Sequence, residues 1–313
     1  MLQQSREAKL ISYWASLARP PITYQEAAHE QSEIILFWAD LGRRVAGIGP
    51  QVSWEQCDLL TKAALAYAKD IAANASDLLM KSNSWLSPLE DPLTVDMGLN
   101  RWLARDREEA YSDWLAWILS SLGDADLIGR LLYGNEIPQA LLACKTQCVC
   151  DREVWAPRGH VDQAGRLDLV LRFDAEAVLV IEVKVEGADS ADTVKQSGYY
   201  GWLVSQEAQF KDAVLLAIDG KAQEYNGFNL VCWRSFCQRL RLLLPEIVTK
   251  KGLVTAALSA GFIAAAERNI LQFPSLCNIS QPSVAMLQLD QLDRVIEYLT
   301  EFANSRRPYG SKR

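Results

Sequence analysis

Two charged residues stand at the end of one of the most apolar stretches of the chain. Residues 178–181 are continuously apolar, and Glu182, Val183 and Lys184 follow them directly. A continuous apolar run of this kind is typical of a strand that is covered on both faces. The two-residue period of a strand places Glu182 and Lys184 on the same face. Because charges at the end of a buried strand cost free energy unless they have partners, we expect Asp168, on the preceding predicted strand, to supply one.

Two carboxylates and an ammonium group that converge at one edge of a sheet predict a site for a hard cation. Mg²⁺ favours carboxylate, water and phosphate oxygens as ligands. Such an ion polarises a phosphate and generates hydroxide, while a lysine beside it orients the water or stabilises negative charge. The alternative for any single Glu-x-Lys sequence is an ordinary ion pair where a strand leaves the core. Features on both sides of this stretch favour the cation site.

The first of these features is the strand that carries Asp168. In residues 165–173, leucine and phenylalanine at every second position point one way, and Asp168, Val170 and Arg172 point the other. This alternation predicts a strand with one well-buried face. Acidic residues separate it from the apolar run at 178–181, which favours a tight hairpin between two neighbouring strands. Arg166 shares the face of Asp168 and could pair with the carboxylates or touch a phosphate.

The second feature is an acidic helix predicted upstream, over residues 105–122. Glu108 and Glu109 lie in its first turns. The spacing from Glu109 to Leu115 and Ile118 favours Glu109 as a third carboxylate for the metal. The alternative interpretation is that both acids lie there because negative charge is stabilised by the helix dipole.

The third feature is a helix predicted downstream, from the loop after Lys184 to about residue 205. It brings Gln196, Tyr199 and Tyr200 toward the strand ends. An amide in that place can hydrogen-bond the attacking water or a phosphate oxygen, and an aromatic ring can stack or merely pack. His160, in a polar loop near the site, could act on a water, but an ordinary loop histidine is the commoner case. Further strands at 213–218 and 228–233 predict an α/β sandwich with a mixed sheet.

These motifs, in their order and spacing, resemble the PD-(D/E)XK nuclease superfamily over about residues 100 to 235. Asp168 stands in Gly-Arg-Leu-Asp-Leu-Val, and Glu182 and Lys184 stand in Ile-Glu-Val-Lys. Glu109 opens a helix similar to the first core helix of the superfamily, and Gln196 belongs to a segment similar to the Gln-x-x-x-Tyr helix of several bacterial branches. The resemblance implies an αβββαβ core, with all five residues catalytic and with Asp168, Glu182 and Glu109 as metal ligands.

The same resemblance implies a Mg²⁺-dependent endo- or exonuclease, with Mn²⁺ as a substitute ion and DNA as the expected nucleic-acid substrate. Restriction, repair or anti-phage defence is the expected setting, by analogy alone. The superfamily also contains inactive members, so a catalytically silent scaffold, or a module that binds nucleic acid or protein, is the alternative. A helical interaction protein without a site would not explain why charges interrupt the core strands.

Three regions are expected along the chain. Residues 1–95 have the spacing of apolar residues typical of helices, which either pack on one another or bind a protein partner. Residues 96–235 form the nuclease-like core after a linker at 82–98. Residues 236–313 form C-terminal helices that pack on the core and end in a basic tail at 306–313.

Charge and cysteine usage narrow the class of protein. The net charge of −7 argues against a general DNA-coating protein. Residues 96–233 carry −9 and residues 234–313 carry +5, so phosphate-binding charge would come from the C-terminal third or from a partner. The grouping of Cys144, Cys148 and Cys150 is more typical of buried free thiols than of a zinc site. With neither a signal peptide nor a bilayer-length apolar run, we expect a cytoplasmic protein that does not enter a membrane; a homo-oligomer is left open.

Overall fold

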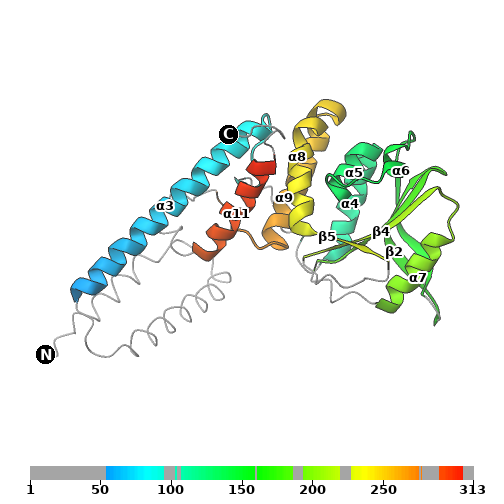
Figure 1. Cartoon of the computed structure of the whole chain (residues 1–313), viewed down its shortest axis with the longest axis horizontal. Coiled ribbons are helices and arrows are strands. Elements are labelled where there is room, and N and C mark those ends of the chain that lie inside the picture. Colours follow the sequence, from blue (N-terminus) through cyan, green and yellow to red (C-terminus); the bar gives the residue numbers. More distant parts are fainter. Residues whose placement is uncertain are drawn as a thin grey trace. The chain divides into compact units, whose positions relative to one another are not determined.

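A computed structural model gives the fold of the chain (Figure 1). It describes residues 54–94, 103, 107–158, 161–185, 193–218, 227–274, 276 and 289–305. The chain forms two compact units, one of residues 1–70 with 281–287 and the other of residues 71–280 with 288–313. The described part of the first unit is the beginning of one helix, at residues 54–70. All the structure that follows, apart from that segment, belongs to the second unit.

The first described element is α3, a helix of 33 residues at Trp54–Leu86. The sequence predicted that a linker would begin at residue 82, but the helix continues to Leu86. Ser82 and Leu86 are both buried in the second unit, and this burial outweighs the weak loop preference of the serines and asparagine there. The short 3-10 helix η1, Pro92–Thr94, follows. Of the described helices, α3 included, none is long and apolar enough to cross a membrane.

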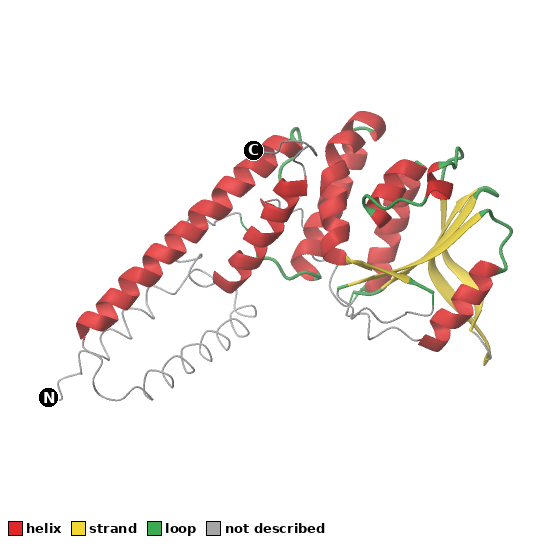
Figure 2. Ribbon diagram, in the orientation of Figure 1, coloured by secondary structure: helices red, strands yellow, loops and turns green. Residues whose placement is uncertain are grey.

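A five-stranded mixed sheet forms the centre of the second unit (Figure 2). Its strands lie in the order β1-β2-β3-β4-β5, with β1, β2 and β3 antiparallel and β4 and β5 parallel to β3. The α/β class and the mixed sheet that the sequence predicted are confirmed. The strand bounds are Val149–Arg158, Val161–Phe173, Ala177–Val183, Phe210–Ala217 and Asn229–Cys232.

Helices cover both faces of this sheet. Figure 2 shows α4 and α5 on one side and α7 on the other. Leu203 of α7 packs with Val170, Val180 and Leu215 in one buried cluster on the α7 side. Every residue of β3 is buried, which confirms the prediction of a strand covered on both faces. The helices are α4 at Glu108–Leu122, α5 at Ala125–Tyr133, α6 at Gln139–Leu142 and α7 at Thr193–Val204.

The C-terminal part of the chain is helical, with α8 at Trp233–Lys251, α9 at Leu253–Asn269 and α11 at Leu289–Ser305. The sequence placed Trp233 at the end of the last strand. In the structure Trp233 begins α8 instead, and α8 passes through Pro245. The reason lies in packing: the Trp233 ring is fully buried against Phe236 and Phe262, which fixes the helix start.

Candidate active site

Asp168 and Glu182 come from neighbouring antiparallel strands, β2 and β3. Leu169 is paired with Ile181, and Val170 with Val180. Continuing that register by one step brings Asp168 opposite Glu182. The Asp168 Oδ2 atom accepts a hydrogen bond of 2.8 Å from the backbone N–H of Val183, and Glu182 is only 1% exposed. The strand register therefore gathers two carboxylates at the end of a buried strand, as the sequence predicted.

Lys184 follows β3 directly and lies between two carboxylates. Its Nζ atom lies 3.3 Å from Oε1 of Glu182 and 2.6 Å from Oε1 of Glu108, the first residue of α4. It also donates a hydrogen bond of 3.1 Å to the carbonyl of Val183. The lysine side chain, 14% exposed, thus joins the strand end to the helix start.

The protonation of Lys184 follows from these neighbours. Burial by itself would lower the pKa of the ammonium, but the charges of Glu182, Asp168 and Glu108, with the hydrogen bond from Lys184 to Glu108, outweigh it and raise the pKa above its ordinary 10.5. Lys184 therefore stays charged at neutral pH. It can donate hydrogen bonds and stabilise negative charge, but it cannot take a proton from a water molecule.

The backbone of Lys184 is held on both sides of its Cα atom. Its N–H donates a hydrogen bond of 2.7 Å to the carbonyl of Leu216 on β4. Its carbonyl accepts a hydrogen bond of 2.7 Å from the indole Nε1–H of Trp233, at the start of α8. Because Lys184 lies one residue beyond the end of β3, these two contacts fix its position after the strand ladder ends. No sequence pattern marks Trp233 as part of this site.

The acid of α4 that reaches the site is Glu108, whereas the sequence favoured Glu109. Glu108 lies three residues before the buried Tyr111 and seven residues before the buried Leu115. All three residues therefore lie on the same, inward-facing side of the helix. Glu109 lies four residues before the exposed Asp113, and its own side chain is exposed. The spacing of the buried residues along α4 was the sequence signal that could have identified Glu108 as the inward-facing acid.

Two predicted polar groups, the side chains of Gln196 and His160, lie outside the described residues. Tyr199 of α7 is fully buried, and its hydroxyl donates a hydrogen bond of 2.7 Å to the carbonyl of Arg166. Of the two roles open to this aromatic residue, the structure shows packing. Tyr200 is 39% exposed, and its ring lies so close to Gly227 that a Cβ atom there would approach it to 2.6 Å.

The side chain of Arg166 is engaged on the surface of β1. It donates a hydrogen bond of 2.8 Å to Glu153, and its guanidinium lies over the ring of Trp155, 4.9 Å from the centroid. Both Arg166 and Glu153 are largely exposed. The contacts of Arg166 thus point to a surface pair with Glu153, rather than to the pairing with the site carboxylates that the sequence left open.

The donor chemistry of the two strand carboxylates fits Mg²⁺. Asp168 and Glu182 offer hard oxygen ligands from adjacent strands, and Mg²⁺ is often held by one or two carboxylates together with water and phosphate oxygens. In the described ranges, no cluster of three or more His, Cys, Asp or Glu side chains could hold a metal ion. The ammonium of Lys184 engages Glu108, so a site built from this cluster would rest on the two strand carboxylates.

The three cysteines at the start of the sheet give no metal site either. Cys148 is buried, Cys144 and Cys150 are partly buried, and all three are free thiols. Burial raises the pKa of the Cys148 thiol to about 12, and it also raises that of Cys150. Both thiols are therefore protonated at neutral pH, as is typical of buried free cysteines.

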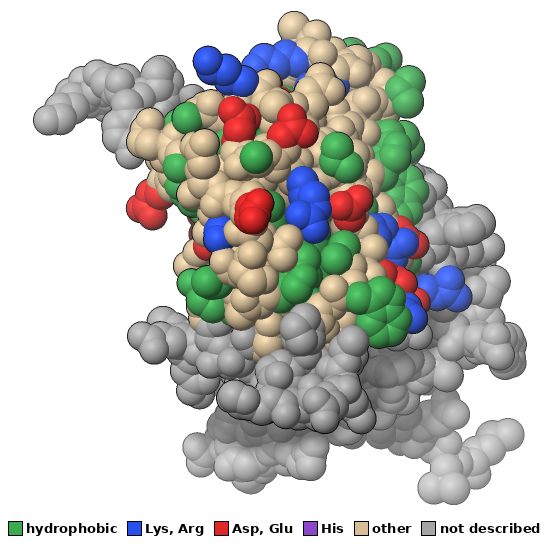
Figure 3. All heavy atoms as spheres, turned by 90° about the vertical axis from the view of Figure 1, so that its right-hand side faces the viewer, with side chains coloured by type: hydrophobic (Ala, Val, Ile, Leu, Met, Phe, Trp, Pro, Cys, Tyr) green, Lys and Arg blue, Asp and Glu red, His purple; other side chains and the backbone are tan. Residues whose placement is uncertain are grey.

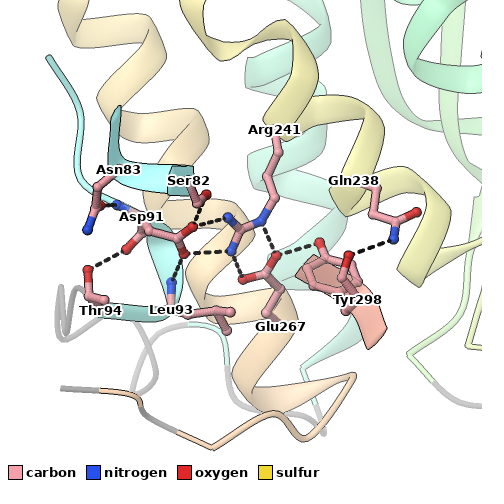
Figure 4. Close-up of polar contacts among 9 residues, drawn as sticks. All are labelled: Ser82, Asn83, Asp91, Leu93, Thr94, Gln238, Arg241, Glu267 and Tyr298. Carbon is pink, nitrogen blue, oxygen red and sulfur yellow. Dashed lines mark hydrogen bonds and ion pairs between the residues drawn. The ribbon is translucent and has the colours of Figure 1, made fainter. Parts of the chain in front are cut away.

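A second polar cluster lies among the helices and surrounds Arg241 of α8 (Figure 4). Its guanidinium forms two hydrogen bonds to Asp91, of 2.7 and 3.0 Å, and two to Glu267, of 2.6 and 2.7 Å. Tyr298 of α11 donates a hydrogen bond of 2.6 Å to Glu267, and Ser82 of α3 donates one to Asp91.

These charged groups serve structure, because Arg241, Asp91 and Glu267 are all 0% exposed and no substrate can reach them. The cluster joins the end of α3 and the segment before η1 to α8, α9 and α11. Each carboxylate accepts hydrogen bonds from the same arginine, so the buried charges compensate one another.

The surface around the sheet carries charges of both signs. Figure 3 shows the face on the right-hand side of Figure 1, where Lys and Arg side chains alternate with Asp and Glu. A large field of one sign, which would attract a phosphate backbone over a distance, is not seen on the described part of this face. Nucleic-acid binding would therefore depend on local contacts or on another part of the chain.

Comparisons with known proteins give no assignment. No protein-family model matches the chain, and neither the curated proteins nor the solved structures contain a significant match. The chemistry and geometry of the cluster around Lys184 are therefore the basis for a proposed function.

Proposed function

We propose that this protein is a metal-dependent nuclease that hydrolyses phosphodiester bonds, with DNA as the expected substrate. One observation carries the proposal. At the end of a fully buried strand, the ammonium of Lys184 lies 2.6 Å from Glu108 and 3.3 Å from Glu182, and Asp168 lies on the neighbouring strand. Burying charges at the end of a strand costs free energy, and a role in phosphoryl-transfer chemistry would account for that cost.

The order of the elements supports the same proposal. Helices α4, α5 and α6 precede the antiparallel strands β1, β2 and β3, and α7 and then β4, parallel to β3, follow them. With α5 and α6 as additions after α4, this order is compatible with the αβββαβ core implied by the resemblance to the PD-(D/E)XK nucleases. Asp168 lies on the second strand of that series, and Glu182 lies on the third with Lys184 directly after it.

Each residue would have a distinct role. Asp168 and Glu182 would hold Mg²⁺ or Mn²⁺, and a bound divalent ion polarises the phosphate and lowers the pKa of water. Lys184 would donate a hydrogen bond to the attacking water or to the oxygen on which negative charge develops. Glu108 would keep the ammonium charged and aimed at the strand end. The roles given to Gln196 and Glu109 by the resemblance stay predictions of the sequence.

A cleavage assay with matched variants tests this proposal. The purified chain would be incubated with linear, circular and single-stranded DNA and with RNA, in the presence of Mg²⁺, Mn²⁺ or EDTA. We expect cleavage that requires the metal and that is abolished in Asp168→Asn and in Glu182→Gln. Asp151→Asn is the matched control, because Asp151 is an exposed acid of the same sheet that is ion-paired with the partly exposed Arg172. Cleavage at the wild-type rate by either site variant would disprove the assignment.

A catalytically silent scaffold is the second candidate, and one observation favours it. Lys184 is paired with two carboxylates, so the cluster is already neutralised in part without a metal ion. In a scaffold the lysine would only compensate buried charge. A wild-type protein that cleaves none of the substrates with either ion, while remaining folded, would support this second candidate.

A further inference from the structure

Trp233 contacts both segments that form the Lys184–Glu108 ion pair. Its indole N–H donates a hydrogen bond of 2.7 Å to the carbonyl of Lys184. Its ring meets the ring of Tyr111 edge to face, with the centroids 5.7 Å apart. Tyr111 lies one turn after Glu108 on the same helix, α4. The indole therefore lies between the lysine at the end of β3 and the helix that carries the glutamate.

Trp233 is itself held firmly. It is 0% exposed, and its ring also packs against Phe236 and Phe262, at centroid distances of 5.8 and 6.1 Å. Tyr111 is anchored in turn, because its hydroxyl donates a hydrogen bond of 2.6 Å to the carbonyl of Leu103. A ring that is packed closely on several sides has little room to move, so the indole N–H has a fixed direction.

The helix that begins at Trp233 is anchored a second time, two turns further along. Arg241 lies eight residues later on α8 and is bound to Asp91 and Glu267 in the buried polar cluster of Figure 4. The start of α8 is thus positioned by aromatic packing and by buried ion pairs together. This arrangement connects the C-terminal helices to the backbone of Lys184.

We propose that Trp233 is a positioning residue for Lys184: its indole N–H holds the lysine backbone beyond the end of β3 and so sets the place of the ammonium beside Glu108 and Glu182. The role as a catalytic aid rests on the nuclease function proposed above. The backbone carbonyl of Lys184 loses a buried donor when the N–H is absent. Of the two hydrogen bonds that hold the backbone of Lys184, only the one to Leu216 then remains.

The variant that isolates this contact is Trp233→Phe, which keeps an aromatic ring and removes the N–H. Phe236→Leu is the control, since Phe236 packs on the same indole from the same helix and its side chain has no hydrogen-bond donor to offer Lys184. In Trp233→Phe we expect kcat to fall about ten- to a hundredfold with KM nearly unchanged, because small displacements of a catalytic group have effects of this size. In Phe236→Leu we expect a lower melting temperature with kcat within about threefold of wild type.

The split between kcat and melting temperature separates positioning from general destabilisation. A displaced ammonium lowers kcat in Trp233→Phe, whereas the loss of packing in Phe236→Leu lowers the melting temperature. If Trp233→Phe keeps the wild-type kcat, or if the two variants behave alike, the positioning role is wrong.

Two further measurements keep the proposal testable. If Trp233→Phe does not fold, Trp233→3-benzothienylalanine replaces the N–H by sulfur at nearly constant shape, and the same kinetic outcomes are expected. If the wild type cleaves no substrate, the nuclease proposal fails, and the rate at which an amine reagent labels Lys184 is measured by mass spectrometry instead. Faster labelling in the Trp233 variant than in Phe236→Leu supports positioning, and equal labelling overturns it.

Discussion

The ammonium of Lys184 lies 2.6 Å from the carboxylate of Glu108, although 76 residues separate the two in the chain. This ion pair connects the end of β3 to the first turn of α4. A second carboxylate, Glu182, lies 3.3 Å from the same nitrogen. The lysine therefore has one acidic neighbour from its own strand and another from the helix, and the contribution of the helix can be tested separately.

Glu108→Gln and Glu109→Gln form a matched pair of variants. We expect Glu108→Gln to slow cleavage about tenfold, since an oriented, charged partner of the lysine is lost. Glu109→Gln should stay within about twofold of wild type, as is usual for an exposed position. Initial rates at saturating Mg²⁺ give the comparison. A large loss in Glu109→Gln with none in Glu108→Gln would favour Glu109 as the site residue, as the sequence predicts.

Lys184→Ala separates an enzyme from a scaffold. In a nuclease, the lysine assists the reaction without holding the ion, so the variant should cleave at least about a hundredfold more slowly and still bind Mn²⁺ in a calorimetric titration. In a scaffold, removal of the ammonium takes a cation away from the buried carboxylate of Glu182 and lowers the free energy of unfolding by about 3 kcal/mol or more. Earlier melting of Lys184→Ala, without any wild-type activity to lose, would favour the scaffold.

The strand residues of the site could be predicted because the period of a strand is simple. Asp168 and Glu182 each stand next to a recognisable apolar pattern, and two-residue alternation was enough to predict that they converge. The choice between Glu108 and Glu109 was harder. Adjacent residues differ by about 100° around a helix, so the selection depends on which residues of α4 are buried, and the apolar pattern fixed that only roughly.

Contacts that join distant segments could not be predicted. Trp233 donates a hydrogen bond to Lys184, which lies 49 residues away in the chain. In the sequence, Trp233 is only an apolar residue near the end of a predicted strand, and nothing there indicates this hydrogen bond. The pairing of Arg241 with Asp91 spans 150 residues, and Asp91 stood in a predicted linker. One signal was present: Glu267 interrupts an otherwise apolar helix, which calls for a buried partner.

Arg241→Met should be strongly destabilising. It leaves two fully buried carboxylates without their shared cation, and the loss of one partner from a buried ion pair lowers the free energy of unfolding by about 3–5 kcal/mol. Arg130→Met is the control, because Arg130 also pairs with a glutamate, Glu246, but both side chains are about a third exposed. Such a pair contributes about 1 kcal/mol or less. Urea unfolding followed by circular dichroism measures both.

The combined variant Arg241→Met with Asp91→Asn and Glu267→Gln tests the cause of that loss. Neutralising both carboxylates removes the unpaired charge, so the triple variant should regain part of the stability that Arg241→Met loses. If the triple variant is less stable than the single one, hydrogen bonding and packing, rather than unpaired charge, account for the loss.

Glu267 gives the stability of the helical part a particular pH dependence. Burial raises the pKa of its carboxyl, and the charge of Asp91 adds to this, so the pKa lies above 4.5 in spite of Arg241. The folded state then binds a proton that the unfolded state has lost, and the free energy of unfolding falls as pH rises from 4.5 through the folded pKa. The pKa of Asp91 shifts in the opposite direction. Burial raises it, but Arg241 and the hydrogen bonds from Ser82 and Leu93 lower it by more. The contribution of ionised Asp91 to the free energy of unfolding is therefore lost only as the pH falls below 3.8.

The two shifts can be separated by urea unfolding of the wild type and Glu267→Gln between pH 5 and 8. We expect the stability of the wild type relative to this variant to decrease as pH rises, because only the wild type carries the group with the raised pKa. Glu246→Gln serves as the control: its pairs with Arg130 and Lys250 outweigh the effect of burial and lower its pKa below 4.5, so its difference from wild type should stay constant over this range. A constant difference for Glu267→Gln as well would mean that Arg241 keeps both buried carboxylates ionised.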